Sequence, residues 1–125
     1  MIRINIYQHP FKRDPASKKA EAEYIKRLSR IAKIHFKKLK EAPLEALYFH
    51  PDGSEVDSPG LAVLLDEQLQ ENNVLHLILG EVSPGSAKHA IQLLSLPLSP
   101  QTEAILLLEQ IYRAFKILSG EPYHK

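Results

Sequence analysis

The chain has 125 residues, of which 44% are apolar and 25% charged, and these values are typical of one globular domain with a net charge of +1. It contains no cysteine, which excludes disulfides, iron–sulfur clusters, thiolate zinc sites and a cysteine nucleophile. No apolar run is long enough to cross a membrane, and the first ten residues lack the apolar segment of a signal peptide. We therefore expect a single domain over residues 1–125, located in the cytoplasm.

The charge is unevenly distributed along the chain. Residues 1–40 hold twelve Lys and Arg against three Asp and Glu, a net of +9, so the remaining 85 residues carry −8. A basic segment of this kind suits an anionic partner, with nucleic acid the leading candidate. A lysine-rich surface that is merely solvated would have the same composition, and basic clustering supplies only affinity that is independent of base sequence. Charge alone leaves both interpretations open.

The first half of the chain alternates strand and helix patterns. Isoleucine alternates with polar residues over 2–6 and predicts a strand with one apolar face. Ser17 can cap a helix that runs over 17–31. Two further strands are expected, at 34–39 and 44–49.

The second half continues the alternation. Pro51-Asp52-Gly53 predicts a turn, and a capping serine followed by proline begins a helix at 58–70. Residues 74–79 are nearly all apolar, as in a central parallel strand covered on both faces. A Gly/Ser/Pro loop at 80–85 and a short helix at 86–93 follow. Strands that alternate with helices predict an α/β fold with a mostly parallel sheet.

After a last strand or extended loop at 95–98, the chain ends in a long helical pattern. Ser99 can cap this helix, Pro100 suits its first position, and Gly120 followed by Pro122 ends it. The apolar residues between them leave only a narrow polar stripe. We therefore expect the helix to be covered by its own sheet and by a second subunit.

The final run LLLEQIYRAFKILSGEPYHK, residues 106–125, resembles the C-terminal signature of the RlmH family. Members of that family are SPOUT-class methyltransferases that modify a pseudouridine of large-subunit (23S) ribosomal RNA at N3. The resemblance implies a SPOUT-type, mostly parallel sheet flanked by helices, with a C-terminal trefoil knot, in a homodimer. It also implies S-adenosylmethionine as the cofactor and large-subunit rRNA or the ribosome as the partner.

The resemblance places the cofactor beyond the carboxyl ends of the strands, where open α/β sheets bind ligands. Gly80 stands where the family keeps a glycine close to the cofactor, and Phe49 where it has a leucine-like side chain. The loop whose backbone holds the adenine aligns with Leu94, Ser95, Leu96, Pro97, Leu98 and Ser99. Without the resemblance, Gly80 would be a plain strand-terminating glycine and the loop an ordinary buried edge.

The expected catalytic residues are Tyr123, His124 and Arg113. The family packs its C-terminal tail beside the active site, often from the other subunit, so His124 could assist deprotonation of the target imide. A tail of this kind would otherwise be frayed. Glu109 and Arg113 are spaced for an i, i+4 ion pair on the helix surface, whereas the functional alternative is that Arg113 contacts RNA phosphate or a partner subunit.

The sequence departs from the family in two respects. Pro100 and Ala104 replace a histidine and an arginine, and the chain is short between Leu39 and Leu44. A non-catalytic RNA- or ribosome-binding homologue is therefore an alternative, and a dimeric structural protein without an RNA role is a second. The histidines show no metal-ligand spacing, so no metal is expected, and His76 is interpreted as a hydrogen-bonded core residue.

Overall fold

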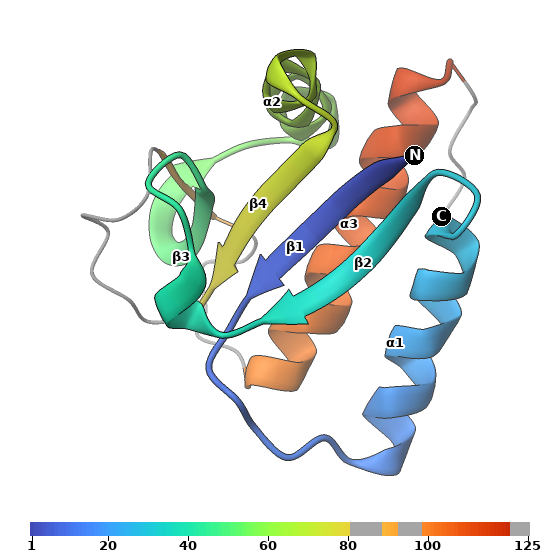
Figure 1. Ribbon diagram of the computed structural model, residues 1–125, viewed down its shortest axis with the longest axis vertical. Helices are drawn as coiled ribbons and strands as arrows, with labels where there is room; N and C mark the ends of the chain where they lie inside the picture. Colours follow the sequence, from blue (N-terminus) through green and yellow to red (C-terminus); the bar gives the residue numbers. More distant parts are fainter. Residues whose placement is uncertain (81–88, 93–98, 121–125) are drawn as a thin grey trace.

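The computed structural model describes residues 1–80, 89–92 and 99–120, and it has a parallel sheet with helices packed against it (Figure 1). The sheet has five strands in the order β2-β1-β4-β3-β5, and all four strand pairs are parallel. The strands are β1 (Ile2–Tyr7), β2 (Ala32–Lys37), β3 (Leu47–Glu55), β4 (Val74–Leu79) and β5 (His89–Gln92). The helices are α1 (Pro15–Leu28), the 3-10 turn η1 (Leu39–Glu41), α2 (Ser58–Glu71) and α3 (Pro100–Leu118). The expected α/β class with a parallel sheet is confirmed.

The main core lies between one face of the sheet and the helices α1, α2 and α3. Alternate residues of the central strands enter this core, among them Ile4, Ile6, Leu75 and Leu77, none of which has any exposed surface. The intervening residues face the other side, where a smaller cluster packs beneath the segment around η1; it consists of Tyr7, Ala46, Tyr48 and Ile78. The strands β1 and β4 are therefore apolar towards the helices and mixed on the opposite face.

Helix α3 begins and ends as the sequence predicts. Ser99 caps it, with its Oγ accepting from the Thr102 N–H at 3.4 Å, and Pro100 is its first residue. After Leu118 the chain reaches Gly120 at φ 75°, a left-handed conformation that glycine adopts readily. The buried face of α3 contacts the sheet, α1 and α2 within one chain; it consists of Ala104, Leu107, Leu108, Ile111, Ala114 and Phe115. One chain therefore covers most of the apolar stripe without a second subunit.

The helix predicted over 17–31 is shifted towards the N-terminus. Asp14, not Ser17, is the cap: its carboxylate accepts from the Ser17 N–H at 2.8 Å, so α1 begins at Pro15. The helix ends at Leu28 and β2 begins at Ala32, earlier than the predicted 34–39. Aspartate is as good a capping residue as serine, and Asp14 lies three residues before Ser17. The helix predicted at 58–70 is confirmed within one residue as α2, although Asp57 caps it.

The segment after Phe49 differs from the prediction. Strand β3 begins at Leu47 and continues to Glu55 through the predicted turn at 51–53, but its register with β5 shifts, because Phe49 and Ser54 both pair with Ile91. The helix predicted at 86–93 is wrong for residues 89–92, which form β5. A helix of only eight residues is marginally stable by itself, so it competes poorly with backbone pairing along an open sheet edge. The predicted elements at 81–85 and 95–98 lie outside the described residues.

Candidate functional site

The carboxyl ends of β1 and β4, together with the middle of β3, lie along one edge of the sheet. Phe49 of β3 is paired with Leu79 of β4, so Gly80 follows directly beside it. The start of α3 reaches the same edge, since the Gln8 Nε2 donates to the carbonyl oxygen of Pro100 at 2.7 Å. Figure 1 shows the N-terminal end of α3 on the side to which the arrowheads of β1 and β4 point. The structure therefore brings Phe49, Gly80 and Ser99 to one edge.

Gly80 has the geometry that a backbone contact with a ligand requires. Its φ is 110°, a conformation that L side chains rarely adopt, and a Cβ built on it would meet no atom within 4 Å among the described residues. The residue is half-buried and ends the central strand β4. A ligand can approach the main chain here without a side chain in between.

The other expected cofactor residues have structural roles of their own. The Phe49 side chain is 1% exposed and packs in the main core, so it supports this edge of the sheet from the core side. Ser99 Oγ caps α3 and donates to Thr102 Oγ1 at 2.8 Å. Residues 94–98 of the predicted adenine loop lie outside the described residues.

Arg113 lies on α3 and pairs with Glu109 at 2.8 Å, which confirms the predicted i, i+4 ion pair. Both side chains are more than four-fifths buried, so the pair is not the exposed surface contact that spacing alone indicates. A partly buried guanidinium held by a carboxylate has a fixed orientation. Tyr123 and His124, the remaining expected catalytic residues, lie outside the described residues.

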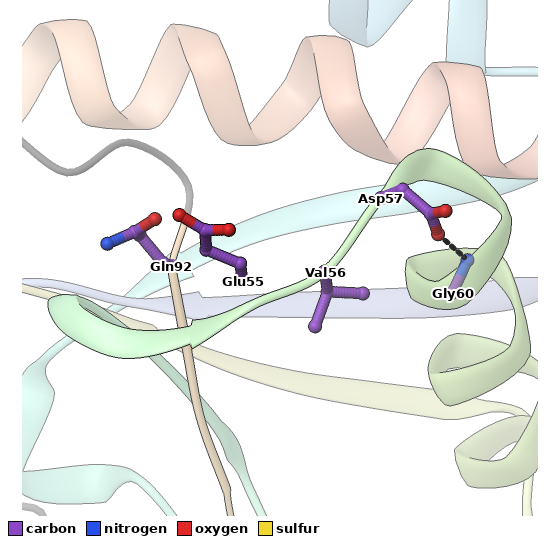
Figure 2. A pocket seen from close by; sticks show the side chains of 5 residues that line it. All are labelled: Glu55, Val56, Asp57, Gly60 and Gln92. Atoms are coloured by element: carbon purple, nitrogen blue, oxygen red, sulfur yellow. Dashed lines mark hydrogen bonds between the residues drawn. The ribbon is translucent and has the colours of Figure 1, made fainter.

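A hollow of about 650 Å³ lies where β3 leads into α2, and sequence reasoning missed the residues that line it: Glu55, Val56, Asp57, Gly60 and Gln92. Figure 2 shows Glu55 and Gln92, which are partners in the β3–β5 register, with their polar groups close together beside this hollow. The Gln92 Nε2 also donates to the carbonyl oxygen of Pro51 at 2.7 Å. The volume lies within the range of about 300–1,000 Å³ typical of small-molecule sites. Only the parallel pairing of β3 with β5 brings Glu55 to Gln92, and the predicted turn and helix concealed that pairing.

The two departures from the family pattern occupy different environments. Pro100 is exposed at the first position of α3. Ala104 is completely buried against the core, with 0% of its surface exposed. An arginine at this position would require the neighbouring side chains to move, so the alanine is matched to the packing of this chain.

His76 is hydrogen-bonded as expected, because its Nδ1 and the Tyr7 hydroxyl oxygen are 2.8 Å apart. Burial lowers the pKa of His76, which favours the neutral ring, and burial likewise raises the pKa of Tyr7. The pair lies on the sheet face opposite the helices, away from Gly80. Among the described residues there is no cluster of His, Asp and Glu that could hold a metal, and no helix long and apolar enough to span a bilayer.

Comparison with known proteins places the chain in a family. A family of predicted SPOUT methyltransferases matches residues 45–124. Ribosomal RNA large subunit methyltransferase H 1 of Thermoanaerobacter sp. is 32% identical over 114 residues, which cover 82% of this chain and 84% of that protein. The methyltransferase H of Pelobacter propionicus is 38% identical over 78 residues (58% and 51%), and that of Bifidobacterium adolescentis is 38% identical over 81 residues (59% and 51%). The match to these last two spans about half of their length. The chain belongs to the SPOUT methyltransferase family and, within it, to the RlmH group.

Proposed function

We propose that this protein transfers a methyl group from S-adenosylmethionine to N3 of a pseudouridine in large-subunit (23S) ribosomal RNA. The observation that carries the proposal is Gly80, whose open, positive-φ backbone ends the central strand of a SPOUT-family sheet beside Phe49 and the start of α3. Relatives that bear the name ribosomal RNA large subunit methyltransferase H support the substrate class.

In this proposal the cofactor lies along the carboxyl edge of the sheet, between Gly80 and the loop from Leu94 to Ser99. The hollow of Figure 2 extends that edge beyond β3, and its Glu55 carboxylate suits the positive charge of a sulfonium or ammonium group. When bound, S-adenosylmethionine supplies the methyl group. The chain has to bind and orient the two reactants, and methyl transfer of this kind depends on positioning more than on acid–base power. The exchange of polar residues for Pro100 and Ala104 is therefore compatible with activity.

The target base would approach Tyr123 and His124, and His124 would assist removal of the imide proton. Arg113 would contact the RNA. Such a base has to leave its stack or sit in an open loop. We further propose that residues 1–125 form one domain with a C-terminal trefoil knot, that the protein acts as a homodimer, and that it works in the cytoplasm. Leu118, 39% exposed at the end of α3, gives a second subunit an apolar point of contact.

The proposal is tested by calorimetric titration with S-adenosylmethionine and S-adenosylhomocysteine. We expect a dissociation constant near the micromolar range, about −8 kcal/mol, and a large loss of affinity in Gly80→Val, where a branched side chain would occupy the open side of the glycine. Methylation of protein-depleted 23S rRNA and of ribosomal particles then tests the substrate. If titration of a folded sample with either compound released or absorbed no heat of binding, the proposal that this protein is a methyltransferase would be refuted.

A non-catalytic RNA-binding homologue is the second candidate, and the burial of Ala104 in place of a polar residue favours it. The two are separated by affinity for the cofactor, since both predict RNA binding that weakens as salt rises. Absence of RNA binding at low salt would instead indicate a structural protein without an RNA role.

A further inference from the structure

A second, smaller hollow of about 180 Å³ lies at the carboxyl ends of β1 and β2, and Phe11, Arg13, Phe36, Lys37 and Lys38 contribute to its lining together with Gln8. It belongs to the basic N-terminal third of the chain. Its volume is below the range of about 300–1,000 Å³ of sites for drug-sized ligands. A single flat ring with a small substituent is therefore the kind of group that it can hold.

The apolar wall of this hollow is a fixed stack of rings and guanidinium. The guanidinium carbon of Arg13 lies 4.3 Å from the ring centroid of Phe11 and 4.8 Å from that of Phe36. Glu21, which is 4% exposed, accepts from Arg13 Nε with both carboxylate oxygens, at 2.7 and 3.1 Å. Aromatic rings and arginine planes are the surfaces on which proteins stack the bases of single-stranded RNA.

The rim of the hollow is positively charged. Lys37 and Lys38 are exposed, and neither forms an ion pair within the described part of the chain. The Glu21 carboxylate is bound to Arg13, and Glu21 does not line the hollow. Two lysines beside a flat apolar wall match the phosphate and the base of one nucleotide.

A buried polar atom gives a second, independent indication of a ligand. Gln8 is 7% exposed and lines the hollow; its Nε2 donates to Pro100, but its Oε1 accepts no hydrogen bond within the described residues. A buried acceptor without a donor is unfavourable by roughly 1–3 kcal/mol, so such atoms are uncommon. Every nucleobase carries N–H groups that could donate to this oxygen after a small rotation of the amide.

We propose that this hollow binds one unstacked nucleotide of the RNA substrate, with the base against the Phe11–Arg13–Phe36 stack and the phosphate against Lys37 and Lys38. The inference rests on the RNA substrate proposed above and adds a second contact to it. Strands β1 and β4 are neighbours and lie about 4.8 Å apart. A nucleotide bound in this hollow would therefore hold the RNA beside the carboxyl end of β4. A neighbouring base of the same RNA could then reach Gly80.

A simpler explanation accounts for only part of these features. Strand β2 is an edge of the sheet, and lysines on edge strands prevent aggregation through strand pairing. That role explains Lys37. It explains neither the Phe11–Arg13–Phe36 stack nor the unsatisfied Gln8.

The charge contribution is tested by fluorescence anisotropy with a labelled five-nucleotide single-stranded RNA and no cofactor. We expect the double variant Lys37→Ala, Lys38→Ala to bind about ten-fold more weakly and to lower the salt slope of log affinity by about 0.7, the value for one lost phosphate contact on a single strand. The matched control Lys18→Ala, Lys19→Ala removes the same charge from exposed positions of α1 and should weaken binding less than about three-fold. Equal losses in the two double variants would overturn the assignment to this hollow.

The stacking contribution is tested with Phe11. We expect Phe11→Leu, which keeps an apolar side chain but removes the ring, to weaken RNA binding by roughly five-fold to a hundred-fold. Phe11→Tyr should retain wild-type affinity, and circular dichroism should show both variants folded. Wild-type affinity in Phe11→Leu would overturn the proposal, as would uridine monophosphate or inorganic phosphate binding as tightly as the RNA, since the site would then serve a free small molecule.

Failure of this inference can be told apart from failure of the proposed function. S-adenosylmethionine affinity should be the same in the wild type and in all these variants, because none of the changed residues is among those proposed to hold the cofactor. If the wild type binds RNA and methylates it while the hollow variants do so equally well, the inference alone fails. If the wild type binds no RNA, the substrate proposed above fails with it.

Discussion

Gly53 is the position where one added carbon atom should disturb this fold most. A Cβ on Gly53 would lie 2.7 Å from the carbonyl carbon of Ile91 and 2.8 Å from the Ala90 carbon and the Ile91 nitrogen. All three are backbone atoms of β5, which crosses against the shifted segment of β3. The expected effect of Gly53→Ala is therefore a separation of β3 from β5.

The size of the effect follows from these distances. The Cβ would be about 0.6–0.7 Å closer to these atoms than ordinary contact at 3.4 Å, and a backbone cannot rotate away as a side chain does. Overpacking of this kind destabilises by roughly 1–3 kcal/mol. For a chain of this length, each kcal/mol shifts the melting temperature by about 3–5 °C, so we expect Gly53→Ala to melt about 3–15 °C below the wild type.

The measurement is a thermal melt followed by circular dichroism, repeated as a urea titration. Gly60→Ala is the matched control: its nearest atoms, Asp57 Oδ1 and Val56 Cγ1 at 2.9 Å, belong to side chains, which yield more readily than the backbone of β5, and alanine favours the helix by roughly 0.5–1 kcal/mol. The control should melt within a few degrees of the wild type or above it. A Gly53→Ala protein as stable as Gly60→Ala would show that β3 and β5 separate freely and would refute the reasoning.

Three further perturbations test other parts of the structure. Leu108→Ala removes a side chain with no exposed surface and should lower the free energy of unfolding by about 2–5 kcal/mol in urea titrations. Because the folded pKa of His76 lies below its unfolded value, its contribution to stability is complete above about pH 6.5 and is lost as the pH falls from there through the lower folded pKa. The urea midpoint should therefore fall less between pH 7.5 and 5.5 in His76→Gln than in the wild type. An equal fall in the two proteins would contradict this. Hydrogen bonds, first from the Ser17 N–H and then from Gln101, lower the pKa of Asp14, so its stabilisation is present above its unfolded pKa and lost in acid. Asp14→Ala should lower the urea midpoint at pH 7, whereas at pH 2 the midpoints of variant and wild type should converge.

The sequence by itself determined the helices that carry strong signals at both ends. Ser99-Pro100 and Gly120 bound α3, and its wide apolar stripe required a buried position, because capping and amphipathicity are properties of a few neighbouring residues. The alternation over β1 and the apolar run of β4 likewise identified strands of the correct kind, within one residue of their observed bounds. The final run, residues 106–125, also identified the family, and the comparisons confirm it.

Tertiary structure decided the elements whose local signals are weak or conflict. Gly53 sits in what reads locally as a turn, but β3 continues through it because β5 pairs with both sides of the shift at Ile91. Residues 89–92 have no strand signal strong enough to stand alone, and they became a strand because the edge of β3 offered unpaired backbone groups. The hollows beside Glu55 and beside Gln8 arose in the same way. Each joins segments that are distant in sequence, and contacts between distant segments leave no periodic pattern along the chain.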